Sequence, residues 1–149
     1  MKSRFVLIAL AFMAASCVST KSTLKNVDDN APAPQLKDGA FVITQTAPDN
    51  QYGYDPDYPI NVFYLNTKDD KINQQRFLNA LAGPNGEHLV YNKVETCCPF
   101  PTKRNSMGVG LLDIYQITWQ GNPTPIRLYF NIHEKGALMV PVGLTLKKP

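Results

Sequence analysis

The sequence predicts an α+β domain: a small antiparallel, meander-like β-sheet with one packed helix, preceded by a signal peptide and a flexible tether. Residues 126–133 (IRLYFNIH) alternate apolar and polar side chains, which is typical of a strand with one buried face. Residues 69–83 carry the one convincing helical pattern. Short connections after the helix favour antiparallel pairing, and together these features predict a sheet with a helix on it.

The first strands are expected at 40–45 (AFVITQ) and 60–65 (INVFYL), which are rich in β-branched and aromatic residues. A loop rich in proline and aspartate separates them. The helix follows: Asp69 or Asp70 can cap its first amides, and Gly83–Pro84 ends it.

Three more strands complete the expected domain, which spans 39–149. Residues 88–95 and 111–119 have the apolar, β-branched character of strands. In 111–119 apolar and polar residues fall on both faces, as in a well-covered central strand. The third, 137–146, contains Pro141 and suits a sheet edge, because proline cannot donate to a strand ladder.

The N-terminus has the layout of a secretory signal, which we assign to residues 1–16. Lys2 and Arg4 precede an apolar run that is too short to span a bilayer as a stable helix. The following AASC (14–17) resembles the lipobox of bacterial lipoproteins, a resemblance that implies cleavage before Cys17 and acylation of that residue. The alternative is ordinary cleavage that leaves a soluble secreted protein. The expected location is the bacterial cell envelope, lipid-anchored at the outer membrane and facing the periplasm or the surface.

Residues 17–38 are predicted to be a flexible tether behind the lipidated cysteine. The stretch is rich in Ser, Thr, Asp, Asn and Pro and poor in large apolar side chains, so it lacks the apolar surface that would offset its ordering entropy. Removal of the signal leaves 13 basic and 12 acidic residues in a mature chain of 133. A balance so close to neutral, without a basic cluster, argues against nucleic acid as a partner.

Cys97 and Cys98 are the only thiols left once Cys17 is acylated. Extended backbone would send the two side chains to opposite faces, where each fills space, and Pro99 biases Cys98 toward that conformation. A disulfide between the neighbours, a soft-metal site and a bond to another chain remain alternatives. We interpret the pair as architectural first, with thiol-redox or soft-metal chemistry as the alternative function.

A second candidate site is the loop around Tyr52, Tyr54, Asp55, Asp57 and Tyr58, where tyrosines and aspartates could form a binding surface for a glycan or calcium. The aspartate spacing does not fit an EF-hand, and a turn-rich loop whose tyrosines pack on the sheet explains the composition equally well. No metal or cofactor site is expected.

No catalytic residue is expected either. Each of the two histidines, His88 and His133, stands on a predicted strand without a nucleophile or carboxylate at a catalytic spacing.

The motifs RFLNALAGPNGE (76–87), YNKVETCCPF (91–100) and GLLDIYQITW (110–119) resemble a group of small bacterial envelope lipoproteins without an established activity. The expected partners are the membrane, through the N-terminal lipid, and another envelope protein or a glycan. Some similar proteins carry the label 2-dehydro-3-deoxyphosphooctonate aldolase. That enzyme is a (β/α)₈ barrel, which typically needs at least about 200 residues and eight strand–helix units. A non-enzymatic role is therefore preferred.

Overall fold

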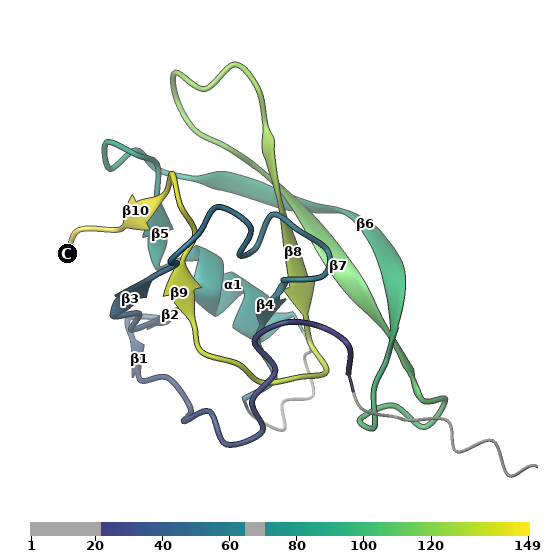
Figure 1. Ribbon diagram of the computed structural model, residues 1–149. Helices are drawn as coiled ribbons and strands as arrows, with labels where there is room; N and C mark the ends of the chain where they lie inside the picture. The colour runs from purple at the N-terminus through teal and green to yellow at the C-terminus, as the bar shows by residue number, and fades with distance from the viewer. Residues whose placement is uncertain (1–21, 65–70) are drawn as a thin grey trace, which may run out of the picture.

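The computed structural model describes residues 22–64 and 71–149, which form ten strands and one helix (Figure 1). The helix is α1 (Ile72–Leu78). The strands are β1 (Leu36–Lys37), β2 (Ala40–Phe41), β3 (Gln45–Thr46), β4 (Ile60–Asn61), β5 (Leu81–Ala82), β6 (Val90–Pro101), β7 (Val109–Thr118), β8 (Ile126–Asn131), β9 (Met139–Val140) and β10 (Thr145–Leu146). The regular structure of the described chain is mainly strand, with one short helix, which confirms the predicted α+β class.

A four-stranded sheet in the order β4–β8–β7–β6 forms the centre of the molecule (Figure 1). β6, β7 and β8 follow one another along the chain and pair antiparallel. At the other edge β4 pairs parallel to β8, and β3 pairs parallel to β9 in a separate two-stranded sheet. The expectation of purely antiparallel pairing is therefore wrong. Long stretches of chain separate both parallel pairs, and parallel neighbours need such a long connection.

Helix α1 contacts β8 and β7 of this sheet through its side chains and also contacts β2. The ring of Phe77, on the helix, meets Phe130 of β8 edge to face, with 5.7 Å between ring centroids. Phe130 meets Tyr115 of β7 in the same manner at 5.2 Å. All three residues are buried, so the contact between helix and sheet is an aromatic core.

The helix is shorter than the sequence predicts. It ends at Leu78 rather than near Gly83, because Leu81–Ala82 forms β5 and pairs with β10. Thr145 Oγ1 donates to the carbonyl of Gly83 at 2.6 Å, which adds a side-chain bond to the pairing of β5 with β10. The N-cap position is Lys71, without a side-chain cap, and the capping residues expected at 69 and 70 lie outside the described part of the chain.

Two predicted strands are each divided between two sheets. The segment 40–45 begins with β2, which pairs with β1, and ends at β3, which pairs with β9. The segment 137–146 gives β9 and β10, with a turn between them in which Leu144 N donates to the carbonyl of Pro141 at 3.1 Å. Gly143 has φ of +92° at this turn, a conformation that glycine adopts without steric cost.

The N-terminal segment from residue 22 contacts the domain, although the sequence assigned it to the tether. Leu24 is buried in a small cluster with Phe100 and Leu112. The backbone N–H of Lys25 donates to the carbonyl of Asp57 at 2.8 Å, and Asn61 Nδ2 donates to the carbonyl of Lys25 at 3.2 Å. One buried apolar side chain and a few hydrogen bonds hold this segment against the domain.

These contacts predict that trypsin cleaves the folded protein slowly after Lys25. Leu24→Ala should lower the free energy of local opening of this segment by about 2 kcal/mol. Cleavage that proceeds through the opened state should then be roughly 30-fold faster. The exposed neighbouring residue provides the control, since Thr23→Ala should leave the rate unchanged. Mass spectrometry of the timed digests measures both rates. Rapid cleavage after Lys25 in the unmodified protein would favour the tether as first predicted.

Candidate functional site

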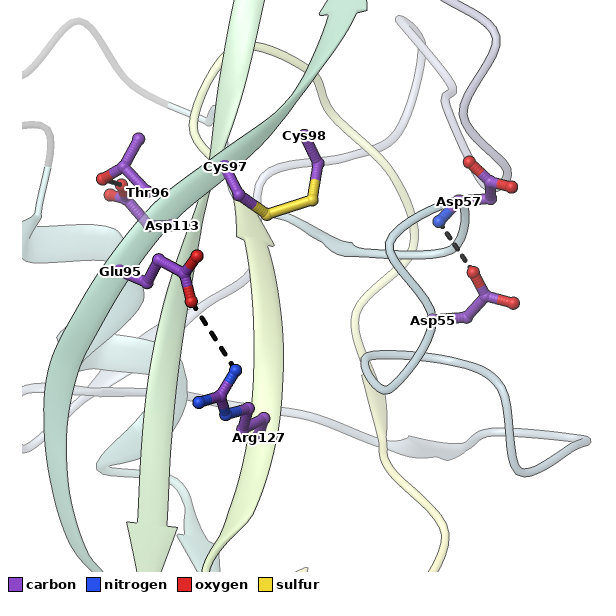
Figure 2. Close-up of a disulfide and its surroundings, with 8 residues drawn as sticks. All are labelled: Asp55, Asp57, Glu95, Thr96, Cys97, Cys98, Asp113 and Arg127. Carbon is purple, nitrogen blue, oxygen red and sulfur yellow. Dashed lines mark hydrogen bonds and ion pairs between the residues drawn. A yellow bond between two sulfur atoms is a disulfide. The ribbon is translucent and has the colours of Figure 1, made fainter.

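Cys97 and Cys98, on β6, are joined to each other in a disulfide (Figure 2). β6 pairs along its length with β7, and the register between the two strands shifts by one residue at Val94 and again at Cys98–Pro99. A shift of this kind is a β-bulge, in which one strand carries an extra residue. Cys98 has φ of +61°, in the left-handed region. The disulfide therefore occupies a bulge near the end of a long strand.

This geometry corrects two expectations about the pair. Cys98 is not extended, although it precedes a proline, and the two side chains do not point to opposite faces. The bulge is the physical reason, because its extra residue leaves the regular pleat and turns Cys98 back toward its neighbour. A left-handed non-glycine residue costs on the order of 1–2 kcal/mol, which the surrounding structure must offset.

The disulfide is half-buried and rests on apolar side chains. Cys98 packs against the cluster of Leu24, Phe100 and Leu112, so the N-terminal segment and the hairpin meet beneath it. Beside it, Glu95 Oε2 lies 3.6 Å from Arg127 Nη1 (Figure 2). Both of these side chains are more than half exposed, so the ion pair adds little to stability.

A polar network beside the same stretch of β6 centres on the buried Asp113 of β7. Thr96 Oγ1 donates to Asp113 Oδ1 at 3.0 Å, and Lys93 Nζ lies 2.6 Å from the same oxygen. From the helix, Gln74 Nε2 donates to Asp113 Oδ2 at 2.7 Å, and Tyr115 OH donates to Gln74 Oε1 at 2.8 Å. This network was not predicted from the sequence. Its signal was a carboxylate in the middle of an apolar strand.

A second charged cluster joins the N-terminal segment to the β6–β7 turn. Glu134 is buried, accepts from Thr102 Oγ1 at 2.6 Å and lies 3.5 Å from Arg104 Nε. Asp29 accepts from Lys103 Nζ at 2.5 Å and from Arg104 Nη2 at 2.6 Å. These two hydrogen bonds, the one from Lys103 first, lower the pKa of Asp29. The cluster was also missed, since its members are far apart in the sequence.

The tyrosine loop packs in part on the domain, and one of its tyrosines is removed from the surface. Tyr52 is fully buried and accepts from the backbone N–H of Met139 at 3.2 Å, so it cannot line a binding surface. Burial raises the pKa of both Tyr52 and Tyr54, and Tyr54 OH donates to the carbonyl of Val142 at 2.7 Å. The partly buried Tyr58 packs edge to face on Tyr52 at 5.4 Å.

The loop aspartates form turns. Asp55 Oδ1 accepts from the backbone N–H of Asp57 at 2.8 Å, a local bond that closes a turn (Figure 2). Among residues 22–64 and 71–149, no three His, Cys, Asp or Glu side chains are grouped so that they could hold a metal ion. The two histidines are apart: His88 is exposed, while His133 lies edge to face with Phe100, 6.0 Å away.

Comparisons with known proteins do not assign this site. No family model, no curated protein and no solved structure matches the chain. Within the part of the chain that the structure describes, no helix is long and apolar enough to cross a membrane. The chemistry available at the site is that of its own residues, and the Cys97–Cys98 disulfide can be reduced by a thiol or dithiol to two cysteines.

Proposed function

We propose that this protein is a lipoprotein of the bacterial cell envelope, anchored through Cys17, with a non-enzymatic binding or structural role. The observation that carries the proposal is the signal layout that ends in AASC. The Cys97–Cys98 disulfide supports it, because disulfides form and persist in oxidising compartments such as the periplasm and are rare in the cytosol.

The state of the buried carboxylates supports a non-enzymatic role. Asp113 is held by Thr96, Lys93 and Gln74, and Glu134 is held by Thr102 and Arg104. Both carboxylates are therefore engaged in structural bonds. The aldolase label carried by similar proteins is the least favoured alternative, since the described residues hold one helix rather than the eight of a (β/α)₈ barrel.

Replacing Cys17 tests the anchor. Wild-type protein should sediment with envelope membranes and be released from them by detergent. Its mature N-terminal peptide should carry the mass of the attached acyl chains. Cys17→Ser should abolish both, because two or more acyl chains anchor a protein stably and none remain. The matched control is Ser16→Ala, which keeps a small residue before the cleavage point and should behave as wild type. Unchanged partitioning and terminal mass in Cys17→Ser would contradict the anchor.

A second candidate function is thiol–disulfide exchange, favoured by the half-buried position of the Cys97–Cys98 disulfide. In such a step a dithiol reductant becomes a disulfide and the pair becomes two thiols, through a mixed-disulfide intermediate.

Thiol counting under native conditions tests the second candidate. The untreated protein should contain no free thiol at Cys97 or Cys98, and two after dithiothreitol treatment. If the disulfide exchanges in the folded state, its reduction should be nearly as fast in buffer as in denaturant, because access and not unfolding limits the rate. The Cys97→Ala/Cys98→Ala double variant has no thiol at either position and gives the background signal of the thiol count. Reduction only in denaturant would exclude the exchange role and leave the pair architectural.

A further inference from the structure

The turn between β6 and β7 presents apolar side chains to solvent. Met107, at the turn, is 84% exposed, and Val109 and Leu111, at the start of β7, are each 45% exposed. The turn is well ordered by its own bonds: Thr102 N donates to the carbonyl of Gly108 at 3.0 Å, and Met107 N donates to Asn105 Oδ1 at 2.9 Å. Grouped exposed apolar side chains of this kind mark an interaction surface.

The chain enters the domain beside this turn. Leu24 packs on Phe100, at the end of β6, and Asp29 bonds to Lys103 and Arg104, which belong to the turn itself. In Figure 1 the first described residues, in purple, lie next to the end of the hairpin where β6 passes into β7. The lipid-bearing terminus is therefore attached to the molecule at the end that carries Met107.

Few residues separate the anchor from the first described residue. Five residue steps separate Cys17 from Ser22, and a chain of that length spans at most about 18 Å. Acyl chains on Cys17 lie in the bilayer, so the same bilayer is within reach of the turn. Tethering at this range converts a weak surface contact into an intramolecular one with a high effective concentration.

We propose that the β6–β7 turn docks on the bilayer that holds the lipid anchor, with Met107, Val109 and Leu111 entering the boundary between headgroups and acyl chains. This inference rests on the proposed lipoprotein function. The charges at the turn are compatible with it: the Lys103 side chain is 58% exposed and can extend toward headgroups, while Asp29 is neutralised between Lys103 and Arg104. The result is a domain held in one orientation, with the opposite end of the sheet directed away from the membrane.

Fluorescence quenching by lipid tests the contact. The lipidated mature protein, with Met107→Trp, is reconstituted into phosphatidylethanolamine–phosphatidylglycerol vesicles with and without brominated acyl chains. The single native tryptophan, Trp119, follows the far end of the ten-residue β7, about 30 Å from the turn, and provides an unquenched baseline. We expect brominated lipid to remove at least about half of the emission that the substitution adds, since an interfacial side chain lies within reach of the bromines.

Two further variants make the result decisive. Thr124→Trp, in the exposed β7–β8 turn, is the matched control and should show no quenching. Val109→Trp should be quenched like Met107→Trp, and it replaces that variant if the latter is unstable. Flotation of each protein with the vesicles is measured first, because loss of flotation reports on the anchor alone. Proteins that float but are not quenched at either turn position overturn the docking and leave the anchor intact. Concentration-dependent cross-linking through the turn without quenching would overturn it in favour of a second copy.

Discussion

Replacing Phe130 with alanine should lower the free energy of unfolding by about 3–5 kcal/mol, the range for removing a large aromatic side chain from a packed core. Phe130 is fully buried on β8, and its ring contacts Phe77 of α1 and Tyr115 of β7. The substitution therefore removes the centre of the contact between helix and sheet. Small domains are stable by only about 5–15 kcal/mol, so the loss would bring the protein close to unfolding.

Urea unfolding followed by far-ultraviolet circular dichroism measures this effect. Phe63→Ala is the matched control, since Phe63 is a partly exposed phenylalanine whose ring faces the guanidinium of Arg104 at 4.7 Å. We expect it to cost about 1 kcal/mol, near the centre of the range for single substitutions. Equal costs for the two variants would contradict the aromatic contact between α1 and the sheet.

Replacing Asp113 with alanine should cost about 3 kcal/mol, because it removes a buried carboxylate and leaves its buried hydrogen-bond donor without an acceptor. Gln74 is fully buried and loses the acceptor for its side-chain amide, while Lys93 and Thr96 lose their shared oxygen. The network also ties α1 to β6 through β7. A loss of this size should therefore appear as a cooperative loss of stability rather than local fraying.

Glu95→Ala is the matched control for Asp113→Ala. It removes a carboxylate from the same hairpin, but the pair with Arg127 is exposed and should contribute less than about 1 kcal/mol. A double-mutant cycle of Asp113→Ala with Gln74→Ala isolates their coupling, which we expect to exceed about 1 kcal/mol for residues that share a buried hydrogen bond. A cost for Asp113→Ala no larger than that for Glu95→Ala would show that the carboxylate is solvated in solution.

The positions of the long strands β7 and β8 were predictable from the sequence, because each has a recognisable pattern of apolar and polar residues. β8 alternates apolar and polar residues with a period of two, although Asn131 at its end is fully buried. β7 is buried on both faces, and both strands were placed within a few residues of their bounds. The candidate sites were less predictable. Cys97 and Cys98 were identified as a pair, but Asp113 and Glu134 were not, because their partners come from distant parts of the chain.

The sequence by itself determined the α+β class and the location of the main strands and helix, since apolar periodicity reports which face of an element is buried. It also provided the basis for the proposed export and lipid anchor. Only the tertiary structure decided the parallel pairing of β4 with β8, the placement of residues 22–38 on the domain, and the left-handed Cys98 at its bulge. Each of these depends on contacts between residues far apart along the chain, whose free energy no local pattern encodes.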